Sequence, residues 1–274
     1  MNAESGYAEV NGTKLYYEIK GKGHPLVLVH GFTLDNRMWD DQFQEFSKHY
    51  KVLRYDLRGY GKSAMPSGQE YTDSDDLMCL MKYLDIEHAH IIGLSMGGCI
   101  ASDFTLSYPG AVDKLVLADT TLNGYTWTEE YGSSLRSIWV TCKERGVEAA
   151  KTQFLDFEIF CSESENPTVY SALKKIIDDY SFIHFLYDIP ECRIKMKPVA
   201  QRLHDIHAPT LVIVGERDSP DFHIIADLLI REIPQATKLI ISRVKHMSNM
   251  EDPETFNKEV LSFLASPSTT SQSQ

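Results

Sequence analysis

The stretch His90-Ile91-Ile92-Gly93-Leu94-Ser95-Met96-Gly97-Gly98 places one serine between two apolar segments. The pattern Gly-x-Ser-x-Gly, with a strand before it and a helix after it, is typical of a tight turn that carries the serine at its tip. Glycine is required two residues to either side of the tip, because a side chain there would meet neighbouring backbone. We therefore expect a strained turn that exposes the Ser95 hydroxyl, followed by a helix over residues 99–108.

Around this turn, short apolar strands alternate with segments of helical periodicity. Strands are predicted as a hairpin over residues 7–20, turning at Asn11-Gly12, and then over residues 26–29, 52–55, 90–94, 115–118, 210–214 and 238–242. Further helices are predicted over residues 37–49, 72–84, 222–232 and 253–264. This alternation predicts the α/β class, with an eight-stranded, mainly parallel sheet that helices cover on both faces.

The alternation stops after residue 120. Residues 121–207 contain no predicted strand, and helical segments are expected over residues 128–144, 147–160, 167–187 and 190–204. A structureless loop of this length is rare in a compact domain, so we predict a helical lid inserted between the sixth and seventh strands. The core is then residues 1–120 and 208–265, and the Ser-, Thr- and Gln-rich tail, residues 266–274, is expected to be disordered.

In a parallel sheet, functional side chains gather beyond the carboxyl ends of the strands. Ser95 lies at one such end, and a serine hydroxyl needs an adjacent base to act as a nucleophile. Of the ten histidines, His246 is the one that directly follows the last strand. Asp218 ends the seventh strand and Asp119 the sixth, so either carboxylate could orient the imidazole. We favour Asp218 as the acid, with Ser95 as nucleophile and His246 as base.

A reaction at Ser95 also needs donors for a developing oxyanion. The Met96 amide opens the helix after the turn, and the Phe32 amide follows the third strand in His30-Gly31-Phe32. Preorganised amides of this kind contribute about 10²–10³ in rate each. We predict that Phe32 and Met96 form an oxyanion hole, whereas the His30 side chain orders its own loop.

In the chain order Ser, Asp, His, these residues resemble the α/β-hydrolase fold family. The resemblance covers residues 7–265, and five motifs carry it: His30-Gly31-Phe32, Asp56-Leu57-Arg58-Gly59-Tyr60-Gly61-Lys62-Ser63, Gly93-Leu94-Ser95-Met96-Gly97-Gly98, Gly215-Glu216-Arg217-Asp218 and His246. Within the family, the chain is most similar to the small, lidded bacterial group of 3-oxoadipate enol-lactonases, carboxylesterases and meta-cleavage-product hydrolases. The turn motif of residues 93–98 and the motif of residues 56–63 are more similar to those of the enol-lactonases and esterases.

The resemblance implies a serine hydrolase that cleaves a small carboxylic ester or lactone through an acyl-enzyme. The same three residues could also hydrolyse a carbon–carbon bond of a meta-cleavage product, or give perhydrolase or cofactor-free haloperoxidase activity. A hydrolase-fold protein that binds a ligand without turnover is the alternative from another class. No metal ion or organic cofactor is expected, since the three side chains supply the chemistry.

The predicted lid should determine which substrate enters. It is rich in aromatic residues, most of which are expected to form its own core, and the candidates for substrate contact are Trp127, Trp139 and His184. A lactone or dienoate carboxylate would need a cation, for which the same region offers Arg136, Lys143, Arg145, Arg193, Lys195, Lys197 and Arg202. The histidines His24, His49, His88 and His204 are expected to be solvated at the surface.

Composition restricts the partners further. Among 274 residues the net charge is −12, which disfavours nucleic acid and an anionic membrane as partners. The first residues have neither the basic nor the apolar region of a secretory signal, and the five cysteines form no C-x-x-C pair. We expect a cytoplasmic protein with free thiols and a small-molecule substrate; the oligomeric state is left open.

Overall fold

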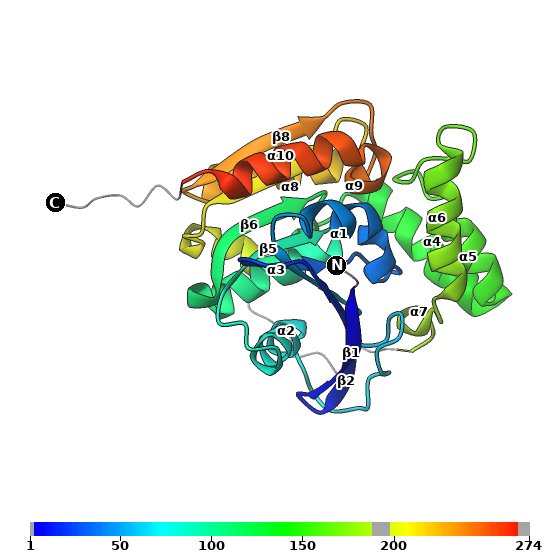
Figure 1. The fold of residues 1–274 in the computed structure, drawn as a ribbon. Coiled ribbons are helices and arrows are strands. Elements are labelled where there is room, and N and C mark those ends of the chain that lie inside the picture. The colour runs from blue at the N-terminus through cyan, green and yellow to red at the C-terminus, as the bar shows by residue number, and fades with distance from the viewer. Residues whose placement is uncertain (1–2, 188–197, 268–274) are drawn as a thin grey trace.

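The protein is built on an eight-stranded sheet with the order β1-β2-β4-β3-β5-β6-β7-β8 (Figure 1). The computed structural model describes residues 3–187 and 198–267. The strands are β1 (Glu4–Val10), β2 (Thr13–Lys20), β3 (Pro25–Val29), β4 (Lys51–Tyr55), β5 (Ala89–Leu94), β6 (Val112–Ala118), β7 (Thr210–Gly215) and β8 (Ala236–Ile241). From β4 to β8 neighbouring strands are parallel, while β1 pairs with β2, and β2 with β4, in antiparallel fashion.

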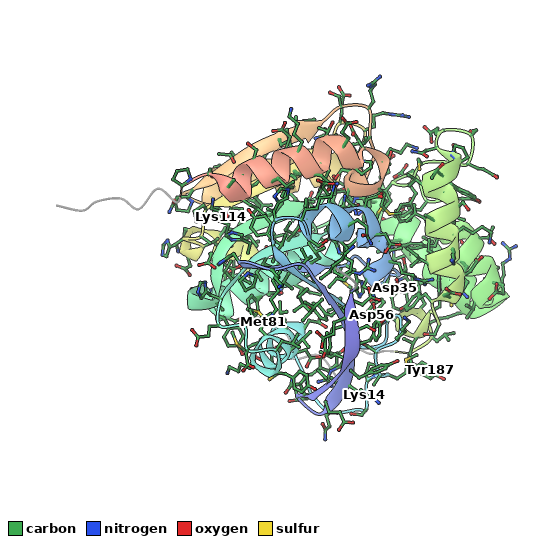
Figure 2. All side chains as sticks on the ribbon, viewed as in Figure 1. Lys14, Asp35, Asp56, Met81, Lys114 and Tyr187 are labelled. Atoms are coloured by element: carbon green, nitrogen blue, oxygen red, sulfur yellow. The ribbon has the colours of Figure 1, made fainter. Side chains whose placement is uncertain are left out.

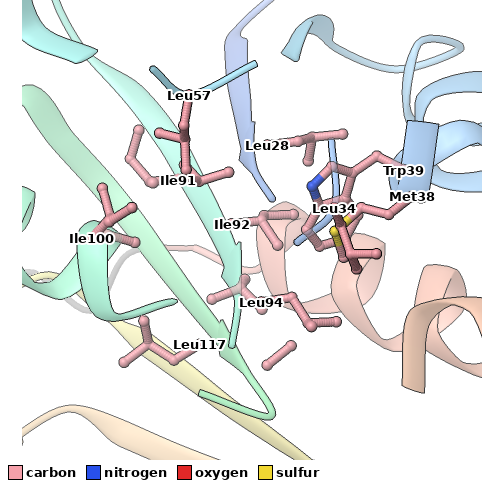
Figure 3. Packing of buried hydrophobic residues seen from close by; sticks show 14 of the residues in the cluster. Leu28, Leu34, Met38, Trp39, Leu57, Ile91, Ile92, Leu94, Ile100 and Leu117 are labelled. Carbon is pink, nitrogen blue, oxygen red and sulfur yellow. The ribbon is translucent and has the colours of Figure 1, made fainter. Parts of the chain in front are cut away.

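The middle strands show why the sheet must be covered on both sides. Every residue of β5 and β7 is buried, and so are all residues of β3 and β6 except one in each. Because successive side chains of a strand point to opposite faces, continuous burial requires packing against both faces. Figure 3 shows this at β5, where Ile91 lies near Ile100 and Ile92 lies near Leu28 and Leu34.

The helices of the core follow the strands in alternation. They are α1 (Asp40–Phe46), α2 (Asp73–Tyr83), α3 (Met96–Ser107), α8 (Pro220–Glu232), α9 (Ser248–Glu251) and α10 (Pro253–Ala265). Helix α1 contacts α10, α2 contacts α3, and α8 packs on β7 and β8. The predicted α/β class and eight-stranded, mainly parallel sheet are confirmed. The predicted helix over residues 37–49 differs in that a 3₁₀ turn, Asn36–Trp39, precedes α1.

Between β6 and β7 the chain forms a group of helices that lies beside the sheet, at the right of Figure 1. We call this stretch, residues 121–207, the helical insertion. Its described α-helices are α4 (Glu129–Arg145), α5 (Val147–Leu155), α6 (Pro167–Asp179) and α7 (Ile183–Leu186). Among the residues that the structure describes, no helix has the length and apolarity needed to span a membrane.

Two of the predicted helices in the insertion were too long. The segment over residues 147–160 ends at Leu155, and the segment over residues 167–187 breaks after Asp179. The break occurs because Tyr180 is extended and Phe182 adopts a left-handed conformation with φ of 57°, which no α-helix accommodates. Phe182 is fully buried, so tertiary packing overrides the local preference for helix.

The last predicted helix of the insertion, over residues 190–204, lies largely outside the described residues. Its described end forms two short 3₁₀ turns, Val199–Gln201 and Leu203–Asp205, instead of an α-helix. The predicted disordered tail also lies outside the described residues from residue 268 onward. The proposed division into a core and a lid as separate domains therefore stays a prediction.

The turn between β5 and α3 has the strained geometry that its glycines predict. Ser95 adopts φ of 56° and ψ of −120°, a region that costs free energy for any residue with a side chain. A Cβ atom on Gly93 would lie 2.1 Å from the Gly97 carbonyl oxygen, and one on Gly97 would lie 2.1 Å from the Val29 carbonyl oxygen. Both contacts are with backbone, which cannot move aside, so these positions admit only glycine.

This close approach predicts a large loss of stability for Gly97→Ala. We expect the free energy of unfolding to fall by about 3 kcal/mol, the upper range for overpacking, as measured by urea denaturation. Gly110→Ala is the matched control, because a Cβ there meets no atom within 4 Å, and it should change stability by less than ~0.5 kcal/mol. Equal denaturation midpoints for the two variants would contradict this account of the turn.

Candidate active site

His246 and Asp218 form a buried pair at the carboxyl ends of β7 and β8. The His246 Nδ1 lies 2.8 Å from Asp218 Oδ2, and the two side chains are 3% and 0% exposed. The second oxygen, Asp218 Oδ1, accepts a hydrogen bond from the Ser219 amide at 2.7 Å. In a neutral imidazole, donation from Nδ1 to the carboxylate leaves Nε2 unprotonated and able to accept a proton.

Asp119, the competing carboxylate, is engaged elsewhere. Its Oδ1 accepts a hydrogen bond from the Gly215 amide at 2.7 Å, and its Oδ2 accepts one from the Ser248 hydroxyl. Complete burial and the neighbouring charge of Asp218 raise the pKa of Asp119 well above its usual value. Asp119 thus ties β7 to the loop that carries His246, whereas Asp218 contacts the imidazole itself.

The surroundings of His246 favour a basic imidazole. Burial by itself lowers the pKa of His246. The charge and the hydrogen bond of Asp218, with smaller contributions from the charges of Asp119 and Glu251, outweigh burial, and the net result is a pKa above the ordinary 6.5. The ring of Phe222 lies 4.3 Å from the imidazole, centroid to centroid. The His246 amide also donates to the Ile159 carbonyl of the insertion at 3.1 Å, so both core and insertion fix this loop.

Ser95 and His246 line the same cavity, which has a volume of about 310 Å³. The Ser95 side chain makes no capping hydrogen bond to its own helix α3, and the residue is half-buried. Its backbone holds the turn in place, since the Ser95 amide donates to the Ala118 carbonyl at 2.9 Å. The hydroxyl is therefore presented to the cavity from a backbone that is fixed on both sides.

The two amides predicted as oxyanion donors also border this cavity. Phe32 and Met96 both line it, and Met96 is the first residue of α3, where amide groups have no partner within the helix. Within residues 3–187 and 198–267, neither amide donates a hydrogen bond to another protein group. Neither amide is therefore already occupied by a partner in the described part of the chain, as an oxyanion donor requires.

The loop that carries Phe32 is ordered by His30. The Leu57 amide donates to His30 Nε2 at 3.0 Å, and His30 Nδ1 donates to the Gly31 carbonyl at 2.9 Å. Because Nε2 accepts, the imidazole is neutral, and burial lowers the pKa of His30 in agreement. The side chain of Phe32 packs against the rings of Phe154 and Phe185, which anchors the loop to the insertion.

The cavity wall is mainly apolar and aromatic. Trp127 lines the cavity, together with Leu34, Leu94, Leu122, Tyr131, Leu135, Phe154, Phe157, Ile159, Phe160 and Met247. The other two candidates for substrate contact lie elsewhere: Trp139 packs on Phe185, and His184 stacks on Tyr60 at 4.4 Å between ring centroids. In the described part of the chain, no Lys or Arg lines the cavity; Arg193, Lys195 and Lys197 lie outside that part.

One end of the cavity is polar. Cys99, Thr121 and Asn123 line it there, and the Cys99 sulfur lies 4.0 Å from the Asp103 carboxylate. Burial raises the pKa of Asp103 to about 7 and that of Cys99 to about 12. At neutral pH the Cys99 thiol is therefore uncharged, and Thr121 and Asn123 add hydrogen-bonding groups to this part of the cavity wall.

Sequence reasoning missed how the insertion is held onto the core. Asp221 Oδ1 accepts hydrogen bonds from the Tyr125 hydroxyl at 2.7 Å and the Thr128 amide at 3.1 Å, and its Oδ2 accepts one from the Thr128 hydroxyl at 2.6 Å. An aspartate just inside a Pro-started helix is an ordinary first-turn residue, so nothing in the sequence pattern indicates these partners. Asp221 thus fixes the entry to α4, and its neighbour in the sequence, Phe222, packs on His246.

Within the described residues, the side chains placed to share a metal ion lie away from this cavity. Among the residues that the structure describes, the group close enough to share a cation is His24, His90 and Asp113. These residues lie at the start of β3, β5 and β6, at the opposite edge of the sheet from Ser95.

Three comparisons with known proteins support the fold. The family model described as alpha/beta hydrolase fold matches residues 24–137. The enol-lactonase from Burkholderia xenovorans LB400 superposes with a TM-score of 0.81 at 27% identity, covering 95% of this chain and 100% of that one. A thermophilic esterase from Thermogutta terrifontis gives a TM-score of 0.81 at 26% identity, covering 95% and 98%. The AB hydrolase superfamily protein YisY of Bacillus subtilis is 26% identical over 261 residues, 91% of this chain and 94% of that protein.

The chain therefore has the α/β-hydrolase fold, and residues 24–137 match the model of that family. Its neighbours include a lactonase and an esterase, which confirms the resemblance that the motifs indicate. Its fold carries a helical insertion between β6 and β7.

The pair of His246 and Asp218 predicts a measurable change in histidine titration. In Asp218→Asn, the charge that raises the pKa is lost while burial remains, so the pKa of His246 should fall. Asp119→Asn is the matched control: the Asp119 carboxyl does not contact the imidazole in any hydrogen bond of the described structure, and the pKa of His246 should change much less. NMR titration of the His246 ring protons measures both, and a larger shift in Asp119→Asn would contradict the assignment.

Proposed function

We propose that the protein is a serine hydrolase that cleaves small, uncharged carboxylic esters or lactones through an acyl-enzyme. The observation that carries this proposal is the meeting of three features at one cavity. Ser95 lies at the tip of a strained turn, His246 is held by Asp218 at 2.8 Å, and the Phe32 and Met96 amides border the same space. A nucleophile, an oriented base and oxyanion donors are what acyl transfer to water requires.

The proposed reaction proceeds in two halves. The Ser95 hydroxyl attacks the carbonyl carbon as His246 Nε2 takes its proton, and the Phe32 and Met96 amides stabilise the oxyanion. Collapse of the intermediate breaks the bond to the alkoxide, which receives the proton from His246. Water then attacks the acyl carbon with His246 again as base, and the acid leaves as Ser95 regains its proton. In a lactone, the alcohol and the acid remain one molecule.

The cavity indicates the substrate class. Its volume of about 310 Å³ is at the lower end for small-molecule sites, and its wall is aromatic and aliphatic. A substrate carboxylate placed there would lose hydration without gaining a cation from the described residues, which is costly. Similarity to an enol-lactonase and to an esterase supports ester or lactone chemistry, while the apolar wall supports an uncharged substrate.

Turnover of an activated ester tests the nucleophile. The wild type should hydrolyse p-nitrophenyl butyrate, and Ser95→Ala should reduce kcat at least ~10⁴-fold, as loss of a nucleophile does elsewhere. Ser133→Ala is the matched control, since Ser133 is exposed on α4, and its rate should be unchanged. A fluorophosphonate should form one adduct, on Ser95. Absence of turnover in the wild type, with thermal stabilisation by ester analogues, would instead indicate a binding protein.

The apolar wall predicts discrimination by charge. Between p-nitrophenyl butyrate and the hemisuccinate p-nitrophenyl ester, which differ in a terminal carboxylate at similar length, kcat/KM should favour the uncharged ester by at least ~100-fold. Steady-state kinetics at two salt concentrations measure the ratio. Preference for the hemisuccinate would show that a cation reaches the substrate and would overturn the uncharged-substrate part of the proposal.

A further inference from the structure

Three histidines and one aspartate gather at the amino edge of the sheet, away from the candidate active site. His24 directly precedes β3, His88 directly precedes β5, His90 lies near the start of β5 and Asp113 near the start of β6. Strands β3, β5 and β6 are neighbours in the parallel sheet, so their starting residues meet at one edge. From the sequence alone His24 and His88 are expected to be solvated; the structure places them together.

Strand register explains why these side chains meet. Leu26 pairs with His90, so His24, two residues before Leu26, lies on the same face of the sheet as His90. Between β5 and β6 the register shifts: Ala89 pairs with Val112 but His90 pairs with Lys114. Asp113 is therefore the extra residue of a β-bulge, a device that redirects a side chain at a sheet edge.

The distances are those of a cluster that can share a cation. One ring nitrogen of His24, one of His90 and one carboxylate oxygen of Asp113 all lie within 4.8 Å of one another. The His24 Nε2 and His88 Nδ1 approach Asp113 Oδ2 at 2.9 and 2.6 Å, and the rings of His24 and His90 lie 4.4 Å apart. Ligand atoms around a tetrahedral zinc are about 3.3 Å apart, so small rotations of partly exposed side chains would complete the geometry.

His90 distinguishes this cluster from an ordinary hydrogen-bonded group. The residue is only 8% exposed, and its Nδ1 is buried with no hydrogen-bond partner. A buried polar atom without a partner costs free energy. The nearby ammonium group of Lys114 does not supply a substitute, because it donates to the carbonyls of Phe263 and Leu264 at the end of α10, where Figure 2 labels it.

We propose that His24, His90 and Asp113 bind a divalent transition-metal ion, with Zn²⁺ as the expected ion, and that His88 orients Asp113 as its hydrogen-bond partner. Two imidazoles and a carboxylate are a ligand set that zinc accepts, with water completing the coordination. A carboxylate that is hydrogen-bonded by a further side chain is the usual arrangement around such ligands.

The site is structural rather than catalytic. Four residues of β5 lie between His90 and Ser95, so the two are five residue steps apart, which corresponds to about 16 Å along a strand. The ion would join the starts of β3, β5 and β6, and would thereby stabilise the folded state without contact with the substrate. The inference is independent of the proposed function.

Metal binding by the full-length, tag-free protein tests the proposal. After removal of metal by chelation, equilibrium dialysis against ZnCl₂ should give one zinc per chain, and saturation should raise Tm by about 5 °C or more. The double variant with His24→Ala and Asp113→Ala should lose at least ~100-fold in affinity. The matched control replaces another partly exposed His–Asp pair, His204 and Asp205, by alanine and should bind as the wild type does.

Two further measurements exclude other zinc sites. The described cysteines, Cys79, Cys99, Cys142 and Cys161, are free thiols and are the competing metal ligands. Because the proposed site contains no cysteine, Co²⁺ substitution should give visible ligand-field bands without a thiolate charge-transfer band. His246→Ala should leave zinc affinity unchanged. A thiolate band, loss of binding in His246→Ala, or equal binding by the wild type and the double variant overturns the site. Because none of these readouts depends on ester turnover, failure here leaves the proposed function untouched.

Discussion

The arrangement of the candidate active site depends on one strained residue, Ser95, whose backbone is held at φ of 56°. Strain at one residue persists only where the surroundings determine it fully. Here the surroundings are backbone: Gly93 approaches Gly97, and Gly97 approaches Val29, at separations that exclude a side chain. This contact places the start of α3 against the ends of β3 and β5. It thereby brings the Met96 amide, the Phe32 loop and the Ser95 hydroxyl to one cavity, whichever substrate that cavity accepts.

The same constraint explains why so much of the core could be predicted from the sequence. A position that only glycine can occupy is visible in the sequence as a glycine at fixed spacing from Ser95, and buried parallel strands are visible as short apolar segments. Functional side chains at strand ends follow from topology, so Ser95, Asp218 and His246 could be named as a set before their distances were known. The choice between Asp119 and Asp218 needed the structure, because both follow strands that lie beside each other. The choice depends on which carboxylate faces the imidazole. Asp218 does so, whereas Asp119 accepts the hydroxyl hydrogen bond of Ser248.

The parts that could not be predicted are those determined by contacts between distant elements. The bend at Phe182 has no glycine or proline to mark it, and it exists because the side chain is buried among other rings of the insertion. His184 and Trp139 were candidates for substrate contact because of residue type alone, and packing directs them elsewhere. The histidine cluster at the amino edge depends on the register of three strands and on one bulge. Neither the strand register nor the bulge can be predicted from the spacing of these residues along the chain.

The helical insertion contacts the proposed base His246 directly, so residues that shape the cavity also support the base. The carbonyl of Ile159 accepts the His246 amide, and Ile159 also lines the cavity. Asp221 fixes the first turn of the insertion, and its neighbour Phe222 packs on the imidazole. A change of cavity wall at these positions therefore alters the support of His246 as well as the space for substrate. Leu135 on α4 also lines the cavity but has no contact with His246 among the described interactions. A change of side chain there would therefore alter the space for a substrate without removing a support of the proposed base.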